Sequence, residues 1–143
     1  MSSRKIREVI HNQHILTAPS DLSVREATRR MTAARVGAIM ITHEKRLVGI
    51  FTERDALVRI LAEGRDPDAT RLEDVMTRAP QTVTPERSLG SALHLMYDGG
   101  FRHVPVVEDG IPVGMISARD ALGPELVEFE AELQQRESIT QLL

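Results

Sequence analysis

One ten-residue sequence occurs twice in this chain with few changes. VGIFTERDAL at residues 48–57 returns as VGMISARDAL at residues 113–122, which is 65 positions later (48 to 113). The register continues upstream without a gap, and it matches Thr17 with Thr82, Ser23 with Ser88, Ala27 with Ala92, Met31 with Met96 and Gly49 with Gly114. Two units that share their apolar rhythm and their polar positions should fold alike and pack face to face about a pseudo-twofold axis. A cleft between them would then occur in two copies.

The composition is that of an ordinary globular protein. The 143 residues allow one compact domain or two half-size units that share a core, and the repeat favours the second arrangement. Apolar residues make up 41% of the chain and charged residues 27%, and no window approaches the roughly 18 consecutive apolar residues of a membrane span. Residues 1–7 are polar and precede no apolar signal-peptide core. We therefore expect a cytoplasmic protein that does not associate with membranes.

Charge and cysteine content exclude several kinds of site. The chain has no Cys, which excludes disulfides, zinc–thiolate sites and thiol nucleophiles. Its net charge is −3 and it has no basic stripe, so we expect no duplex nucleic-acid partner. His11 and His14 could form a metal pair, but neither a helix signal nor a carboxylate at ligand spacing follows them, so we expect no metal. The expected ligand is a small molecule.

Each copy begins with a helix pattern. Ser23 and Glu26 have the spacing of a capping box, and the apolar residues that follow recur at helical intervals, which predicts a helix over residues 24–35. In the second copy, Ser88 precedes a similar apolar stripe that stops at Gly99 and Gly100. The same helix is therefore predicted twice.

Two short apolar runs follow each of these helices and predict a β-hairpin. The predicted strands cover residues 38–42 and 47–51 in the first copy, and 104–107 and 111–116 in the second. Asp109-Gly110 is a strong type I′ turn signal, whereas residues 43–45 give a weaker one. Pro105 and Pro112 cannot donate a ladder hydrogen bond, so we expect them at an edge or a bulge.

Each hairpin ends in a short, mainly polar segment, residues 52–55 in the first copy and 117–120 in the second. Thr52 and Ser117 can cap a second helix, which gives the unit the order strand, helix, strand, strand, helix. The predicted fold is α/β (α+β), with two βαββα repeats about a pseudo-twofold axis and a C-terminal helix. The predicted boundaries are repeat 1 at 1–62, a linker at 63–70, repeat 2 at 71–123, and a helix and tail at 124–143.

The predicted C-terminal helix, Glu125 to Arg136, carries a narrow apolar stripe. Leu126, Phe129 and Leu133 lie on one face among many Glu residues. A helix of this length is marginal in water by itself, so the stripe needs a neighbour in its own module, a second subunit or a regulated partner. A contact between two copies is the most economical of these arrangements.

These features together resemble one known family. The residues that carry the resemblance are Thr17-Ala18 and Thr82-Val83, the run Phe101 to Val107, and the Gly-Xaa-Xaa-Thr/Ser-Xaa-Xaa-Asp ending of each hairpin. The chain resembles a pair of cystathionine β-synthase (CBS) domains, a Bateman module, over about residues 6–122, and it is similar to small stand-alone bacterial CBS-pair proteins. The resemblance implies a non-catalytic sensor of AMP, ADP, ATP or S-adenosylmethionine that signals to a partner protein and forms a homodimer.

The resemblance also implies site residues in two clefts between the repeats. The acidic residue of each hairpin ending would bind ribose hydroxyls, and basic residues of the other repeat would meet phosphates. One cleft would join Thr52, Arg54 and Asp55 to Thr82, Val83, Arg102, His103, Val104 and Pro105. The other would join Ser117, Arg119 and Asp120 to Thr17, Ala18, Gly37 and Ala38. Only the first has a cation pair to hold phosphate.

Each of these residues also has a purely structural interpretation. Thr52 with Asp55, and Ser117 with Asp120, are ordinary capping residues at a helix start. Arg54 and Arg119 could be solvated surface charges. The whole module could be a structural adaptor with empty clefts, or, with less support from the spacing, an enzyme that uses a base in the cleft.

Overall fold

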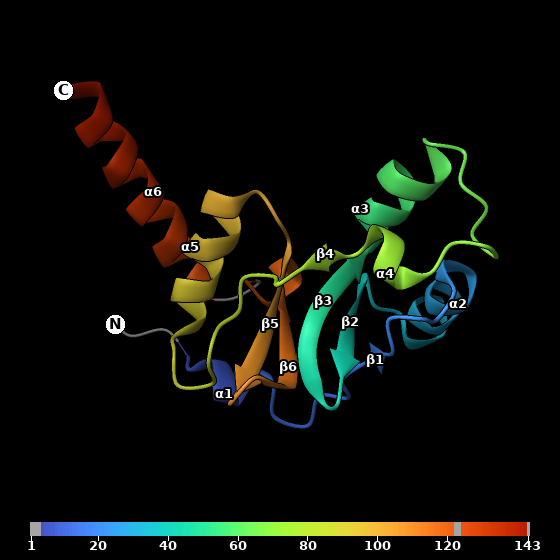
Figure 1. The fold of residues 1–143 in the computed structure, drawn as a ribbon. Helices are drawn as coiled ribbons and strands as arrows, with labels where there is room; N and C mark the ends of the chain where they lie inside the picture. The colour runs from blue at the N-terminus through green and yellow to red at the C-terminus, as the bar shows by residue number, and fades with distance from the viewer. Residues whose placement is uncertain (1–3, 122–123, 143) are drawn as a thin grey trace. The chain divides into compact units, whose positions relative to one another are not determined.

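The computed structural model describes residues 4–121 and 124–142 (Figure 1). The helices are α1 Ile6–Val9, α2 Val24–Ala34, α3 Glu53–Asp55, α4 Leu72–Val75, α5 Leu89–Gly99 and α6 Pro124–Leu142, with a π-helical segment η1 Ala56–Leu61 and a 3₁₀ turn η2 Ala118–Ala121. The strands are β1 Thr17–Ala18, β2 Ala38–His43, β3 Arg46–Thr52, β4 Thr77–Arg78, β5 His103–Glu108 and β6 Ile111–Ser117. The mixed α+β fold predicted from the sequence is confirmed.

The chain divides into two compact units. The repeat-1 unit consists of His14–Gln81 and Val107–Val113, and the repeat-2 unit consists of Met1–Gln13, Thr82–Val106 and Gly114–Leu143. The tip of the second hairpin thus belongs to the repeat-1 unit, where the Leu47 amide donates to the Gly110 carbonyl at 2.9 Å. The segment before the first repeat belongs to the repeat-2 unit.

The repeat-1 unit has a four-stranded sheet in the order β1-β2-β3-β4. Strand β1 runs parallel to β2, with Ala18 opposite Ile41, and the other neighbours are antiparallel. Phe51, Ile39 and Ile41 are fully buried in the core, together with the inner face of α2. Burial of these side chains is the main stabilisation of the unit.

The repeat-2 unit reproduces this arrangement in shortened form. Strands β5 and β6 form a two-stranded sheet, and Val83 makes a parallel bridge to Val106, 65 positions beyond the pair Ala18 and Ile41. The Val83 amide donates to the Pro105 carbonyl at 3.0 Å. Pro105 and Pro112 both lie in this sheet, in which each strand has one neighbouring strand among the described residues, as predicted for residues without an N–H.

Both first helices begin and end where the sequence predicts. The Ser23 hydroxyl accepts from the Glu26 amide and the Ser88 hydroxyl from the Ser91 amide, each at 3.1 Å. Helix α2 ends at Arg35, which takes the left-handed conformation with φ 57°, and α5 ends at Gly100 with φ 72°. Glycine takes this conformation without strain, whereas arginine does so at a cost.

Both predicted hairpins are confirmed, and their turns are alike. Asp109 and Gly110 have φ 53° and 81°, as a type I′ turn requires. Glu44 and Lys45 have similar positive φ angles, 50° and 71°, although neither residue is glycine. The weaker sequence signal of the first turn thus reflects residue types that are strained in this geometry, not a different geometry.

A short segment ahead of each repeat docks on the other repeat, which the sequence analysis did not predict. In the repeat-2 unit, the Ile6 amide donates to the Arg87 carbonyl at 2.9 Å; in the repeat-1 unit, the Leu72 amide donates to the Leu22 carbonyl at 2.9 Å. We call residues 4–10 and 70–76 the lead-in segments. Helices α1 and α4 are their helical parts.

The matched glycines of the repeat make room for these lead-in segments. A Cβ on Gly114 would lie 2.6 Å from Cγ2 of Ile10, and a Cβ on Gly49 would lie 2.5 Å from Sδ of Met76. Carbon atoms in contact are normally about 3.5–4.0 Å apart. Glycine at position 114 is therefore a packing requirement of its lead-in segment, whereas at position 49 a side chain would require the Met76 thioether to move.

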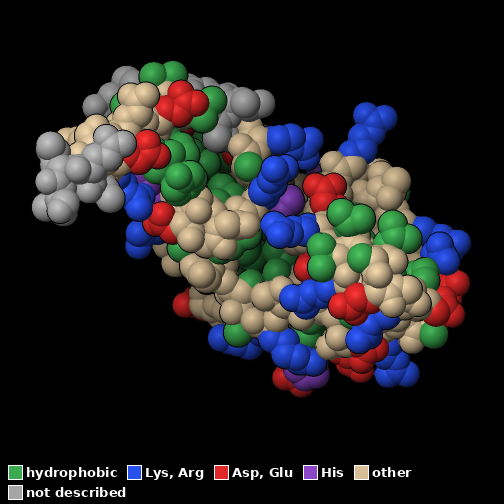
Figure 2. Space-filling model, turned by 90° about the horizontal axis from the view of Figure 1, so that it is seen from above, with side chains coloured by type: hydrophobic (Ala, Val, Ile, Leu, Met, Phe, Trp, Pro, Cys, Tyr) green, Lys and Arg blue, Asp and Glu red, His purple; other side chains and the backbone are tan. Residues whose placement is uncertain are grey.

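The surface carries charges of both signs. Figure 2 shows Lys and Arg side chains in several separate groups, with Asp and Glu side chains between them. No helix of the described residues is long and apolar enough to cross a membrane.

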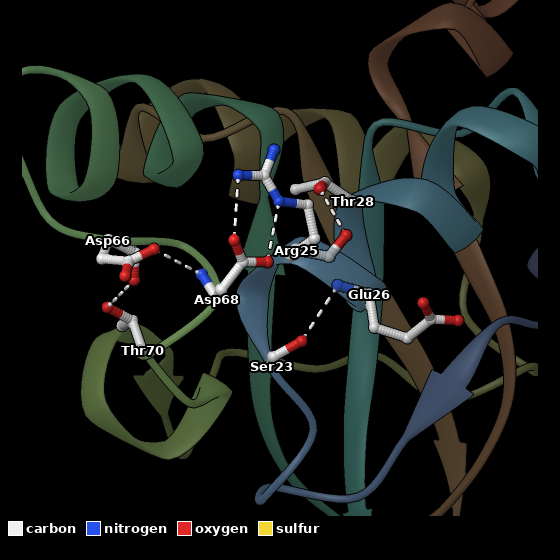
Figure 3. A network of polar contacts seen from close by, with 7 residues as sticks. All are labelled: Ser23, Arg25, Glu26, Thr28, Asp66, Asp68 and Thr70. Carbon is white, nitrogen blue, oxygen red and sulfur yellow. Dashed lines mark hydrogen bonds and ion pairs between the residues drawn. The ribbon is translucent and has the colours of Figure 1, made fainter.

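The predicted linker, residues 63–70, is tied to the start of α2 (Figure 3). Arg25 forms two hydrogen bonds with the Asp68 carboxylate, at 3.0 and 3.3 Å, and this guanidinium lowers the pKa of Asp68. The Asp68 amide donates to the Asp66 carboxylate, and the Thr70 hydroxyl donates to the Asp66 carbonyl. Turn and cap hydrogen bonds thus hold this polar segment against the repeat-1 unit.

The helix predicted after the first hairpin is found, and after the second hairpin the described residues 118–121 form a 3₁₀ turn where an α-helix was expected. After Thr52 the chain continues through α3 and η1 to Leu61. After Ser117 the described residues form the turn η2, and α6 begins at Pro124. Proline has no N–H and disfavours helix in the residue before it, so it starts helices and does not extend them. Helix α6 then continues past the predicted end at Arg136.

Candidate functional site

The predicted site residues of the first repeat lie together at one end of the β2–β3 hairpin. Ala38 opens β2 directly opposite Thr52, the last residue of β3. The Glu53 amide donates to the Gly37 carbonyl at 2.9 Å, which joins the start of α3 to the start of β2. Strand β1 adds Thr17 beside β2, paired with Met40. Hydrogen bonds of the sheet therefore bring together three segments that are separate in sequence.

Asp55 is held firmly at this end of the hairpin. Its Oδ2 accepts from the Thr52 amide at 2.9 Å and from the Thr52 hydroxyl at 3.1 Å, while the Asp55 amide donates to that hydroxyl at 3.3 Å. Its Oδ1 lies 3.5 Å from Nε of Arg59, and the side chain is 15% exposed. The capping-box interpretation is confirmed. A carboxylate has about four lone-pair positions, so this cap leaves acceptor capacity on Oδ1.

The second repeat builds the same arrangement 65 positions later. The Ala118 amide donates to the Arg102 carbonyl at 2.9 Å, as Glu53 does to Gly37. Oδ2 of Asp120 accepts from the Ser117 amide at 2.7 Å and from the Ser117 hydroxyl at 3.3 Å. The two carboxylates thus have equivalent positions in their units.

The two sets differ in charge. At the start of the second strand, the repeat-2 unit has Arg102 and His103 where the repeat-1 unit has Gly37 and Ala38. The Arg102 side chain is exposed and His103 is partly exposed. Arg54 and Arg119 are exposed as well, and no ion pair involving either is found in the described ranges. The cationic set therefore belongs to the repeat-2 unit.

The remaining predicted residues are mainly structural in their placement. Val104, Pro105 and Val83 are buried within the repeat-2 unit, and Ala18 and Ala38 are buried within the repeat-1 unit. Thr17 is partly exposed and Thr82 exposed. Because these side chains are buried, the residues can contribute only their backbone groups to a ligand site. The crosswise combination of the two sets into two clefts stays a prediction.

A partly buried ion pair that the sequence analysis missed lies next to Asp120. Nη2 of Arg4 is 2.9 Å from Oε1 of Glu125, whose side chain is 3% exposed. The hydrogen-bonded guanidinium lowers the pKa of Glu125, and the carboxylate raises the pKa of Arg4. The two residues are 121 positions apart in the chain, and no local pattern marks either of them.

The described residues contain no group of three or more His, Cys, Asp or Glu that could hold a metal ion. His11 and His14, considered as a metal pair, are both exposed on the segment that leads into β1.

The fold and the duplicated hairpin ending agree with one known domain family. The CBS domain family matches residues 6–62 and 72–123. The chain therefore belongs to the CBS domain family and carries two CBS domains in tandem.

Two relatives from Arabidopsis thaliana illustrate the sequence similarity. The chain is 37% identical over 124 residues to the CBS domain-containing protein CBSX3, mitochondrial. This match covers 83% of this chain and 60% of that protein. The chain is 39% identical over 121 residues to the CBS domain-containing protein CBSCBSPB3, and this match covers 84% of this chain and 22% of that protein. The chain thus spans less than two thirds of the length of either relative.

Two solved structures are similar in fold and are described with adenosine-containing ligands. The CBS domain protein PAE2072 from Pyrobaculum aerophilum, complexed with AMP, has a TM-score of 0.79 at 27% identity, covering 89% of this chain and 98% of that one. The CBS domain pair of MJ0100, in complex with 5′-methylthioadenosine and S-adenosyl-L-methionine, has a TM-score of 0.74 at 25% identity, covering 82% and 92%.

Proposed function

We propose that this chain is a non-catalytic regulatory module that binds an adenosine-containing ligand and transmits its presence to a partner protein. The observation that carries the proposal is the duplicated hairpin ending. In each unit, a Thr or Ser donates to the carboxylate of the Asp three residues later and holds it at an equivalent position. The solved relatives in complex with AMP and with S-adenosylmethionine support this class of ligand.

Asp55 and Asp120 are the proposed ribose acceptors. The cap fixes each carboxylate through Oδ2, so the side chain is already oriented before a ligand arrives. A carboxylate oxygen can accept from both hydroxyls of a cis-diol, and these charge-assisted hydrogen bonds are stronger than neutral ones. The cap and the ligand role are thus compatible in the same residue.

Arg102 is the proposed phosphate contact, with His103 beside it. An exposed guanidinium can form two parallel hydrogen bonds with a phosphate, and Gly37 and Ala38 offer no such group at the equivalent positions. A phosphorylated ligand should therefore distinguish the two sets. We propose that AMP prefers the set predicted to combine Thr52 and Asp55 with Arg102.

A panel of ligands tests this proposal. AMP, ADP, ATP and S-adenosylmethionine are added to the protein in a thermal-shift assay, with 2′-deoxy-AMP as the control that lacks one ribose hydroxyl. A ligand that binds the native state raises the melting temperature by mass action. We expect AMP to raise it and 2′-deoxy-AMP to raise it less.

Other outcomes identify the rival functions. No shift with any adenosyl ligand indicates a structural adaptor or dimerisation module. Conversion of a nucleotide during incubation with the protein, measured by chromatography, indicates an enzyme. Light scattering of the same sample tests the homodimer, which we propose on the family resemblance.

A further inference from the structure

The two units differ at one position of their lead-in segments. The Arg4 carbonyl accepts from the Leu89 amide at 2.8 Å, and the Thr70 carbonyl accepts from the Val24 amide at 2.9 Å, so Arg4 and Thr70 are structural equivalents. The Thr70 side chain is buried and bonds locally to the Asp66 carbonyl. The long cationic side chain is therefore a feature of the repeat-2 unit alone.

Arg4 contacts both η2 and α6. Its Nη2 donates to the Asp120 carbonyl at 3.4 Å, on the η2 side, and to Oε1 of Glu125 at 2.9 Å, on the α6 side. Its Nε lies 3.2 and 3.3 Å from the two oxygens of Glu125, and its backbone amide is 3.2 Å from Oε2. One arginine thus joins the end of the Ser117–Asp120 turn to the start of α6.

The first repeat needs no such connection. There Asp55 is the last residue of α3, which continues directly into η1, so backbone hydrogen bonds of one helical stretch hold the Asp55 turn. In the second repeat, the described residues form two separate elements, η2 and α6, and α6 begins at Pro124. The Arg4 side chain contacts both of these elements.

Helix α6 has further contacts with α5, which itself packs against η2. The Phe129 ring meets the rings of His94 and Tyr97 edge-on, with centroids 4.9 and 5.9 Å apart. His94 also contacts Glu132. One turn further, Arg136 Nη2 lies 3.3 Å from Oδ1 of Asp98, and both side chains are about half exposed. The side chains of these contacts join α6 to α5, whereas the Arg4 side chain joins α6 to the Asp120 carbonyl.

We infer that Arg4 and Glu125 are positioning residues for the Asp120 site, and that they couple occupancy of this site to the docking of α6. The inference rests on the proposed function of Asp120. A ligand that binds the Asp120 carboxylate favours the ordered turn, and the ordered turn favours the Arg4–Glu125 contact that fixes the first turn of α6. Because such coupling is reciprocal, loosening α6 at Glu125 weakens the ligand, and binding the ligand tightens α6.

Hydrogen exchange without ligand tests the structural part of the inference. Glu125→Gln keeps the shape of the side chain and removes its charge, and Arg136→Gln is the matched control at the far contact of α6. We expect Glu125→Gln to raise amide exchange about threefold or more in both residues 118–121 and residues 125–131. Arg136→Gln should raise it only in the later turns of α6. Wild-type exchange of residues 118–121 in Glu125→Gln would overturn the positioning role.

Calorimetry with AMP tests the coupling. We expect Glu125→Gln and Arg4→Lys to weaken binding at the Asp120 site several-fold, whereas Arg136→Gln binds as the wild type does. AMP should also slow exchange in residues 125–131 of the wild type. Binding of AMP that Asp120→Ala weakens, with no change of exchange in residues 125–131, would overturn the coupling. Failure of the wild type to bind any adenosyl ligand would refute the proposed function and the coupling together, while the exchange data without ligand would still decide the positioning role.

Discussion

Substitution of Gly114 by alanine tests the docking of the lead-in segments most sharply. The new Cβ would lie 2.6 Å from Cγ2, 2.8 Å from Cβ and 2.9 Å from Cδ1 of Ile10. These contacts are roughly 1 Å shorter than the about 3.5–4.0 Å of a normal contact, and a rotation about χ1 of Ile10 cannot move its Cβ away. Overpacking of this kind costs about 1–3 kcal/mol. We expect Gly114→Ala to lower the free energy of unfolding by about 2 kcal/mol.

Gly49→Ala is the matched control from the other repeat. Its Cβ would meet Sδ of Met76 at 2.5 Å, Cγ of Met76 at 3.1 Å and the Thr77 carbonyl oxygen at 3.1 Å. The thioether lies far along a flexible side chain that can rotate away, and the carbonyl contact is tight by only a few tenths of an ångström. Alanine also restricts the unfolded chain, which contributes about 0.4–1 kcal/mol in the opposite direction. We therefore expect a loss of less than about 1 kcal/mol for Gly49→Ala.

Urea unfolding followed by circular dichroism measures these differences, since the chain has no Trp. The double variant Gly114→Ala with Ile10→Gly should lose about 1–2 kcal/mol less than the sum of the two single variants, because glycine at position 10 removes all three clashing atoms, the Cβ included. Strictly additive losses, or equal losses for Gly114→Ala and Gly49→Ala, would refute the packing argument.

Three further predictions follow from the site and from α6. Arg102→Ala should weaken AMP about tenfold or more and adenosine little, because only AMP carries the phosphate; equal losses in calorimetry would exclude a phosphate contact. Deletion of residues 124–143 removes the partner of Arg4 and uncovers Tyr97, so it should destabilise the repeat-2 unit and, if α6 also holds the homodimer, lower the mass seen by light scattering; an unchanged mass and unchanged exchange in α5 would leave α6 without either role. The lowered pKa of Glu125 implies stability that is fully present above its ordinary value of 4.5 and is lost as the pH falls through the lower folded value, so the stability difference between wild type and Glu125→Gln should shrink below pH 4.5; a difference independent of pH would contradict this.

The elements with local signals could be predicted from the sequence. The caps of α2 and α5 depend on a serine and the amide three residues later, and the hairpin turn depends on Asp109-Gly110. The same holds for the carboxylates of Asp55 and Asp120, because a spacing of three residues places the side chain on the backbone of the capping residue.

The features that depend on distant contacts could not be predicted. The lead-in segments contact residues about 80 positions away in one unit and about 50 in the other, and their only signal was the match of Gly49 with Gly114. Arg4 and Glu125 look like surface charges until the fold brings them together. The apolar stripe of α6 predicted a neighbour but not which one, and the structure supplies α5 of the same unit.

The same distinction applies to ligand chemistry. The spacing of Thr52 and Asp55 defines where a carboxylate is held, but the identity of a ligand depends on all the groups that surround it. The resemblance to the family, and not the spacing, therefore carries the prediction of an adenosyl ligand.

The most direct test of the central claim is calorimetric titration of AMP into the wild type and into Asp55→Ala and Asp120→Ala. Loss of a charge-assisted hydrogen bond costs about 1.5–3 kcal/mol, so we expect the affinity at the altered site to fall roughly 10- to 150-fold. Loss of the cap should cost about 1 kcal/mol of stability, so both variants should remain folded. Folded Asp55→Ala and Asp120→Ala proteins that bind AMP with wild-type affinity at both sites would show that the two aspartates are only helix caps.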